Sequence, residues 1–135
     1  MGERGNPTIM ERKYNILVID DDISTIQVIS MILNNAGYMI TADPTAELEF
    51  LSTGKNPDLL LMDNQVGEKC GATICFELKR NEKTRHMPVI LFSGVDNLEE
   101  LAGRACADDY IAKPFGMTTL LQKVEFFLQQ KAIAC

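Results

Sequence analysis

The stretch PDLLLMD, residues 57–63, places four consecutive apolar residues between a proline turn and an aspartate. A continuous apolar run of this length predicts a strand that is buried on both faces, because a strand with one wet face would alternate apolar and polar residues. Asp63 then stands at the end of a buried strand, where a charge needs a partner. The stretch therefore predicts a strand in the middle of a covered sheet, ending in a carboxylate that is paired with another group.

Segments of the same kind alternate along the rest of the chain. Short apolar strands are predicted at 14–19, 38–42, 58–62, 89–92 and 110–112, and a helix is predicted after each of them. Asp22 suits the N-cap of the first helix and Gly37 its C-terminal end. The second helix is expected from about residue 43 to residue 54, a loop at 64–71, and a third helix that the segment 86–88 ends. The inward positions expected in the last three helices are Ile74, Cys75 and Leu78, then Leu98, Leu101, Ala102 and Ala105, and finally Met117, Leu120, Leu121, Val124, Phe127 and Leu128.

Five strands that alternate with five helices indicate one α/β domain. Strands this apolar are expected to be covered on both faces, in a five-stranded parallel sheet between helices. The crossovers between parallel strands should be right-handed. The domain is expected to span residues 14–131, after a flexible polar lead-in at residues 1–13 and without an effector domain.

The composition is that of an acidic globular protein. The 135 residues carry a net charge of −6, and 46% of them are hydrophobic. No apolar run approaches the roughly 18 residues of a membrane span, and the N-terminus lacks the apolar region of a signal peptide, so a cytoplasmic protein without membrane insertion is expected. The scattered basic residues predict no direct contact with nucleic acid. The four cysteines form no C-x-x-C pair and there is one histidine, so free thiols are expected rather than a zinc site.

Side chains at four predicted strand ends can form one site. They are Asp20 with Asp21, then Asp63, Ser93 and Lys113. In open α/β sheets, sites lie beyond the carboxyl ends of the strands. Clustered carboxylates repel one another unless a cation lies among them, and an all-oxygen set suits Mg²⁺. An aspartate can also accept a phosphoryl group, whose oxygens Mg²⁺, Lys113 and Ser93 could then stabilise.

Four blocks carry a resemblance to a known family: NILVIDDD (15–22), PDLLLMD (57–63), PVILFSG (88–94) and ADDYIAKPF (107–115). As a set they resemble the signature blocks of the response-regulator receiver family of two-component signal transduction, over about residues 14–130. The resemblance implies a flavodoxin-like (βα)₅ fold, doubly wound, with strand order 2-1-3-4-5. It further implies a stand-alone receiver that takes part in a phosphorelay.

The resemblance also implies a role for each site residue. Asp63 matches the phospho-acceptor that forms an aspartyl phosphate, and Lys113 and Ser93 match the groups that act on the phosphoryl oxygens. Ser93 and Tyr110 match the switch pair. The implied Mg²⁺ site consists of Asp20, Asp21, Asp63 and the backbone carbonyl of Gln65, of which Asp21 and Asp63 would touch the metal directly.

The implied partners are proteins. A sensor histidine kinase or a phosphotransfer domain would supply the phosphoryl group, and the chain would assist only its own phosphorylation and dephosphorylation rather than act as an enzyme. The output would be a downstream protein target, or a self-dimer, bound by the face of the fourth helix, fifth strand and fifth helix.

Five positions depart from the family pattern. Gly67 stands where the loop after the acceptor usually carries proline. The segment 68–70, Glu-Lys-Cys, replaces the usual glycine, hydrophobic residue and aspartate, and Cys106 replaces a common glycine. None of these changes removes a group that would handle phosphate.

Other functions remain open at this point. The segment DDDIS, residues 20–24, also fits the opening motif of haloacid-dehalogenase-like phosphatases, with Asp20 as the nucleophile, Asp22 as the acid–base and the 108–109 acidic pair. Against this, the acidic pair precedes Lys113 and Asp63 has no role. A flavodoxin-type FMN carrier would place phosphate against an aspartate triplet that repels it. A degenerate receiver that serves only as a docking module is the third alternative.

Overall fold

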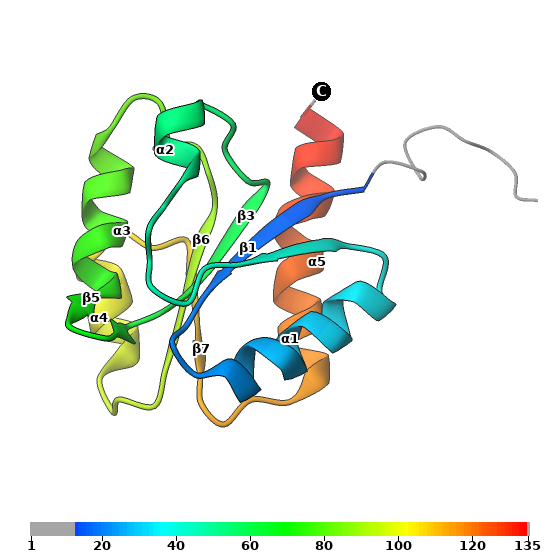
Figure 1. Cartoon of the computed structure of the whole chain (residues 1–135), viewed down its shortest axis with the longest axis horizontal. Coiled ribbons are helices and arrows are strands. Elements are labelled where there is room, and N and C mark those ends of the chain that lie inside the picture. Colours follow the sequence, from blue (N-terminus) through cyan, green and yellow to red (C-terminus); the bar gives the residue numbers. More distant parts are fainter. Residues whose placement is uncertain (1–12, 135) are drawn as a thin grey trace, which may run out of the picture.

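The computed structural model describes residues 13–134, and the lead-in predicted for residues 1–13 lies outside them except for Lys13. Five parallel strands form one sheet in the order β2-β1-β3-β6-β7 (Figure 1). Their bounds are β1 Asn15–Ile19, β2 Met39–Ala42, β3 Leu59–Asp63, β6 Val89–Ser93 and β7 Asp109–Ala112. Counted along the chain, this is the predicted order 2-1-3-4-5, and the flavodoxin-like doubly wound fold is confirmed.

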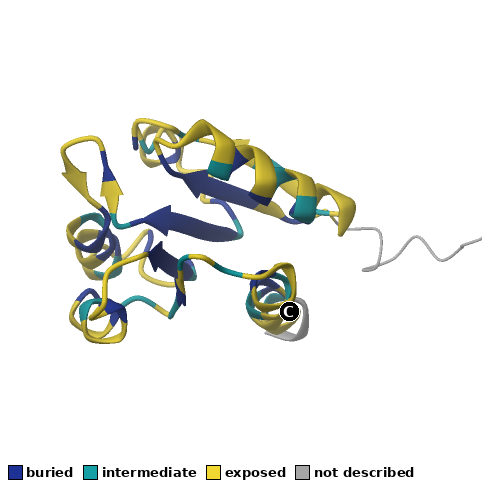
Figure 2. Ribbon diagram, turned by 90° about the horizontal axis from the view of Figure 1, so that it is seen from below, coloured by how far each residue is buried: buried dark blue, intermediate teal, exposed yellow. Residues whose placement is uncertain are grey.

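Helices cover both faces of the sheet. They are α1 Ile23–Asn35, α2 Phe50–Thr53, α3 Gly71–Arg80, α4 Leu98–Arg104 and α5 Met117–Ala134. One apolar cluster joins a sheet face to α2, α3 and α4, and the other joins the opposite face to α1 and α5. Figure 2 shows the buried strands between helices whose outer surfaces are exposed. Among residues 13–134, none of the helices has the length and apolar character that a membrane crossing requires.

The termini of α1 follow from its sequence as predicted. Asp22 is the N-cap, and its carboxylate accepts hydrogen bonds from the Ser24 amide and hydroxyl and from the Thr25 hydroxyl. These bonds satisfy donors at a helix start and lower the pKa of Asp22, the Ser24 hydroxyl contributing most. Gly37, with φ of 99°, follows the C-cap in the left-handed region that glycine favours.

The strand β2 is less covered than predicted. β3 and β6 are buried along their whole length, whereas β2 is exposed or half-buried throughout. The Met39 side chain is 52% exposed. Coverage of both faces therefore holds for the centre of the sheet and fails at this edge.

The second helix is one turn long instead of spanning residues 43–54. The Asp43 carboxylate accepts hydrogen bonds from the backbone amides of Glu47 and Leu48, at 2.9 Å each. Ala46 and Leu48 have positive φ values of 55° and 53°, outside the helical region. A side chain that binds nearby amides offers the backbone an alternative to a helix, and residues 43–49 adopt it.

The predicted loop at 64–71 contains a small antiparallel hairpin, β4 Gln65–Val66 and β5 Lys69–Cys70. A two-residue turn joins the strands, and its first residue, Gly67, has φ of 61°. Two-residue hairpin turns need such positive φ values, which glycine adopts without strain.

Two further expectations are wrong in detail. Helix α3 ends at Arg80, and turns occupy 81–87, where the Thr84 hydroxyl donates to the Leu78 carbonyl at 2.6 Å. Met117, predicted to face the core, is 58% exposed because it lies at the first position of α5. Leu120, Val124 and Leu128 form the buried stripe of that helix.

Candidate functional site

The predicted site residues meet at the carboxyl edge of the sheet. Asp63 and Ser93 are the last residues of β3 and β6, and Asp20 and Lys113 directly follow β1 and β7. The registers pair Asp63 with Phe92, and Ser93 with Ala112, so neighbouring strands end at nearly the same level. Parallel strands thus bring residues that are far apart in the sequence to one edge.

Three carboxylates form the centre of this site. Asp20, Asp21 and Asp63 each offer one oxygen, and these oxygens lie within 4.8 Å of one another. Asp20 is 1% exposed and Asp63 is 9% exposed, whereas Asp21 is exposed. The cluster is therefore buried on the sheet side and accessible from solvent through Asp21.

Lys113 compensates part of this negative charge. Its Nζ atom lies 3.2 Å from a carboxylate oxygen of Asp20 and 3.2 Å from one of Asp63, and 4.8 Å from the centre of the Phe92 ring. Burial alone would lower the pKa of Lys113, but the two carboxylates outweigh it, so the pKa is raised. The lysine is held fully charged between the two acids.

Asp63 is destabilised as an anion. Burial raises its pKa, and the nearby Asp20 raises it further, while Lys113 and the backbone amide of Gln65 act in the opposite direction. The net effect is a raised pKa, because the loss of hydration exceeds the attraction to one lysine.

The two predicted switch residues lie on neighbouring strands, Ser93 on β6 and Tyr110 on β7. Ser93 is 7% exposed, and its hydroxyl oxygen accepts a hydrogen bond from the Val95 amide at 3.3 Å. The ring of Tyr110 is half-buried against the cluster under α3 and α4, and Lys123 of α5 lies 5.4 Å from its centre. Tyr110 is thus placed between the buried sheet and the surface of α5.

The β4–β5 hairpin contacts the carboxylate cluster through its turn. The Gly67 amide donates a hydrogen bond of 2.8 Å to Asp21, across 46 positions of sequence. At the other end of the hairpin, a Cβ atom on Gly71 would collide with the backbone oxygen of Asp63. The start of α3, directly after the hairpin, therefore packs against the end of β3 more closely than a side chain at position 71 would permit.

Lys69 ties the same hairpin to the irregular segment 43–49. Its Nζ atom donates to the carbonyls of Thr45 and Ala46, at 2.9 Å each. The hairpin consequently bridges the carboxylate cluster and the segment that replaces most of the second helix.

The comparison with known proteins agrees with this geometry. The sequence model of the family described as "Response regulator receiver domain" matches residues 16–125. The chain belongs to this family.

Relatives of the receiver domain include transcription regulators. This chain is 31% identical over 118 residues to the DNA-binding dual master transcriptional regulator RpaA of Synechocystis. The match covers 85% of this chain and 49% of RpaA. The chain spans about half the length of the curated relatives it matches.

Solved structures share the fold of the receiver domain. One is the signal receiver domain of a signal transduction histidine kinase from Syntrophus aciditrophicus, with 27% identity and a TM-score of 0.78 over 87% of this chain and 91% of that one. Another is the BeF3-activated receiver domain of DrrB from Thermotoga maritima, with 28% identity and a TM-score of 0.75 over 87% of this chain and 99% of that one.

The phosphatase interpretation is wrong for this receiver. It required the pair Asp108 and Asp109 at the site, but Asp108 accepts a hydrogen bond from the Val89 amide, and Asp109 is the first residue of β7. Both lie at the amino ends of the strands, opposite the carboxylate cluster. Asp22, the presumed acid–base, is engaged in capping α1.

The donor set of the receiver fits a magnesium ion. Mg²⁺ binds oxygen ligands and keeps several waters, so it suits a cluster that opens to solvent on one side. With Lys113 charged, three carboxylates leave an excess of two negative charges, which a divalent cation would balance. The strand ends predicted the three carboxylates. The contacts of Gly67 and Lys69 were not predicted, although a glycine that opens a two-residue turn is a recognisable hairpin signal.

Proposed function

We propose that this receiver domain accepts a phosphoryl group on Asp63, in a Mg²⁺-dependent reaction with a sensor histidine kinase or a phosphotransfer domain. The observation that carries the proposal is the position of Lys113, within 3.2 Å of both Asp63 and Asp20 at the sheet edge. When Asp63 accepts a phosphoryl group, the negative charge lies on the phosphoryl oxygens. Lys113 can then bind one of these oxygens while it keeps its contact with Asp20.

The reaction is a displacement at phosphorus. A carboxylate oxygen of Asp63 forms the new O–P bond while the N–P bond to the donor histidine breaks, and the electron pair returns to the imidazole nitrogen. The burial that raises the pKa of Asp63 also strips water from its oxygens and leaves them available for attack. Bound Mg²⁺, held by Asp21, Asp63 and the Gln65 carbonyl and oriented by Asp20, would supply positive charge to the phosphoryl oxygens.

Side chains of this chain complete the stabilisation of the phosphoryl group. Lys113 exchanges its bond to Asp63 for one to a phosphoryl oxygen and keeps Asp20 as its second partner. The Ser93 hydroxyl donates a hydrogen bond to another oxygen. Charge-assisted hydrogen bonds of this kind are stronger than neutral ones, so the phosphorylated form gains contacts.

Phosphorylation is transmitted as a structural change on the face formed by α4, β7 and α5. When the Ser93 hydroxyl turns toward the phosphoryl group, space opens that the half-buried Tyr110 ring can fill. Its movement changes the face of α4, β7 and α5, where a downstream protein or a second copy would bind. Such a change biases two pre-existing arrangements rather than creating a new one.

Similarity to other receivers supports this function. DrrB is described as BeF3 activated, and BeF3 has the shape and charge of a phosphoryl group bound to a carboxylate. RpaA is DNA-binding, but the acidic composition of this chain supports only protein partners for the receiver itself. We place this function in the cytoplasm, without enzymatic action on other substrates.

The direct test is phosphorylation by acetyl phosphate with Mg²⁺, followed by intact mass and peptide mapping. We expect one phosphoryl adduct on the peptide that carries Asp63. Asp63→Asn should abolish the adduct, and Asp20→Asn should slow its formation without moving it. An adduct on Asp20, or one that persists in Asp63→Asn, would overturn the assignment. No adduct in the wild type would favour the docking-module alternative.

A further inference from the structure

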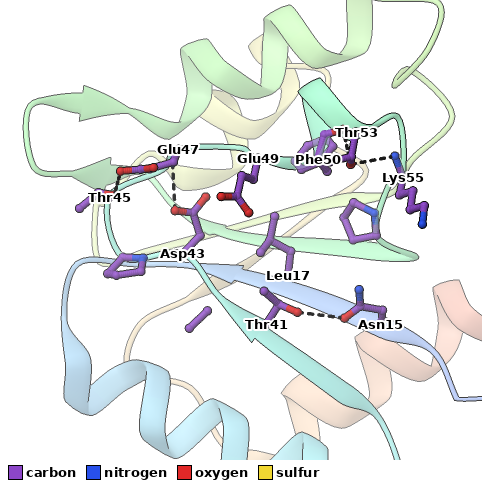
Figure 3. Close-up of a pocket in the computed structure, with 13 residues that line it drawn as sticks. Asn15, Leu17, Thr41, Asp43, Thr45, Glu47, Glu49, Phe50, Thr53 and Lys55 are labelled. Carbon is purple, nitrogen blue, oxygen red and sulfur yellow. Dashed lines mark hydrogen bonds between the residues drawn. The ribbon is translucent and has the colours of Figure 1, made fainter.

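A groove lies over the edge of the sheet, where the second helix is only one turn long. Its volume is about 470 Å³. Leu17 of β1, Thr41 of β2 and Phe50 of α2 line its floor (Figure 3). The face of β2 that the second helix was expected to cover is therefore the wall of an open groove.

The charged side chains of the groove are separated by sign. The carboxylates of Asp43, Glu47 and Glu49 lie together at one end, and Lys55 lies at the other (Figure 3). Asp43 is engaged with backbone amides through both oxygens, whereas Glu47 and Glu49 are exposed. The groove thus presents an apolar floor beside two accessible carboxylates.

The adjoining strand edge is available for pairing. The Met39 and Asp43 amides donate to the carbonyls of Tyr14 and Val18, at 2.8 and 2.9 Å, on the side of β1. Because amides alternate in direction along a strand, those of Ile40 and Ala42 point away from the sheet. The segment 38–42 contains no charge and no proline, the usual devices that protect an edge strand from another chain.

We propose that this groove and edge bind a basic, extended segment of another protein. The segment adds a strand to β2 through the amides of Ile40 and Ala42. A lysine or arginine side chain then enters the groove, with its stem against Leu17 and Phe50 and its charged end at the carboxylates. Backbone bonds supply affinity in this mode, and side-chain pockets supply specificity. Long basic side chains commonly place an apolar stem and a charged end in this way.

A second copy of this chain fits the site less well. The chain carries a net charge of −6, and a copy paired through β2 would bring the same carboxylates next to the first set. Like charges brought together across an interface oppose binding. Binding at this groove does not require phosphorylation of Asp63, because none of the residues of the carboxylate cluster lines the groove.

The test uses an acetylated seven-residue peptide of alternating lysine and valine, titrated into the ¹⁵N-labelled protein. We expect amide shifts confined to β2, to Leu17 and to residues 43–50, with the wild-type protein remaining a monomer in ultracentrifugation. The Glu47→Gln/Glu49→Gln double variant should weaken binding roughly three- to tenfold, as expected for two exposed charge pairs. The matched control is Glu77→Gln/Glu99→Gln, which removes the same charge from α3 and α4 and should leave the affinity unchanged.

Two further peptides separate strand addition from charge attraction. A peptide with glutamate in place of lysine should not bind, and the lysine peptide N-methylated at every amide should lose most of its affinity, because neither of its edges can then donate hydrogen bonds to β2. Equal weakening by both double variants, or full binding of the N-methylated peptide, would overturn the proposal. So would a dimer of the wild-type protein that forms through β2 without the peptide.

Discussion

The centre of the sheet and its β2 edge are built on different principles. In the centre, β3 and β6 are buried along their whole length and end in the residues of the carboxylate site. At the edge, β2 is exposed, and the segment after it is held by side-chain bonds to backbone amides and carbonyls. Hydrophobic burial determines the first region and local polar contacts the second, so the site rests on the rigid part of the molecule.

The largest difference should come from truncating one side chain in each region. Leu60 of β3 is fully buried, so Leu60→Ala should lower the free energy of unfolding by about 3 kcal/mol. Met39→Ala, at the exposed edge, should change it by no more than about 0.5 kcal/mol. Urea unfolding measures both. Similar losses in the two variants would contradict the distinction.

The close approach of the start of α3 to the end of β3 should be the next most sensitive feature. A Cβ atom at position 71 collides with the backbone of Asp63, so Gly71→Ala should cost about 2 kcal/mol. Gly103 of α4 has open space around it, and Gly103→Ala should instead stabilise by about 0.5 kcal/mol. If Gly71→Ala left the free energy of unfolding unchanged, the start of α3 would be able to move away from β3.

Metal binding should then link the site to stability. At tenfold excess over Kd, Mg²⁺ should stabilise the folded wild type by about 1.4 kcal/mol. The same Mg²⁺ concentration should stabilise Asp63→Asn much less, because this variant lacks one of the three carboxylates. If millimolar Mg²⁺ left the melting temperature of the wild type unchanged, the proposed magnesium site would be wrong.

The pH dependence without metal follows from the raised pKa of Asp63. The folded state holds this proton more tightly than the unfolded state, so its contribution to stability is complete below the usual carboxyl pKa and is lost as the pH rises through the folded value. At neutral pH and without Mg²⁺, Asp63→Asn should therefore be the more stable protein. The difference should shrink on acidification, and thermal melting across that range checks it.

The smallest expected effect concerns the edge alone. Lys69→Met removes two hydrogen bonds to the carbonyls of Thr45 and Ala46, and should cost about 1 kcal/mol. Amide hydrogen exchange should accelerate at 43–48 but not in β3. Lys55→Met, an exposed substitution nearby, should neither lower the free energy of unfolding nor accelerate exchange at 43–48. If Lys69→Met accelerated exchange throughout β3, the edge and the centre of the sheet would be one cooperative unit.

The two regions also differ in how well the sequence predicts them. Apolar runs such as 59–62 determine their own burial, so the buried strands and the meeting of Asp20, Asp63, Ser93 and Lys113 at their ends could be predicted from the residues. The strand order followed only from the resemblance to the receiver family. The shortened second helix could not, because it depends on one aspartate that binds amides four and five residues ahead. The contacts of Lys69 and Gly67 join segments that no periodic pattern connects.

The Gly67 amide offers a native spectroscopic reporter of the site. Its hydrogen is bonded to a carboxylate of the cluster, so its proton chemical shift depends on the charge that Asp21 carries or shares with a cation. A proline at this position would have no amide hydrogen and would give no such signal. One backbone resonance at the hairpin tip can therefore follow cation binding in solution without any introduced label.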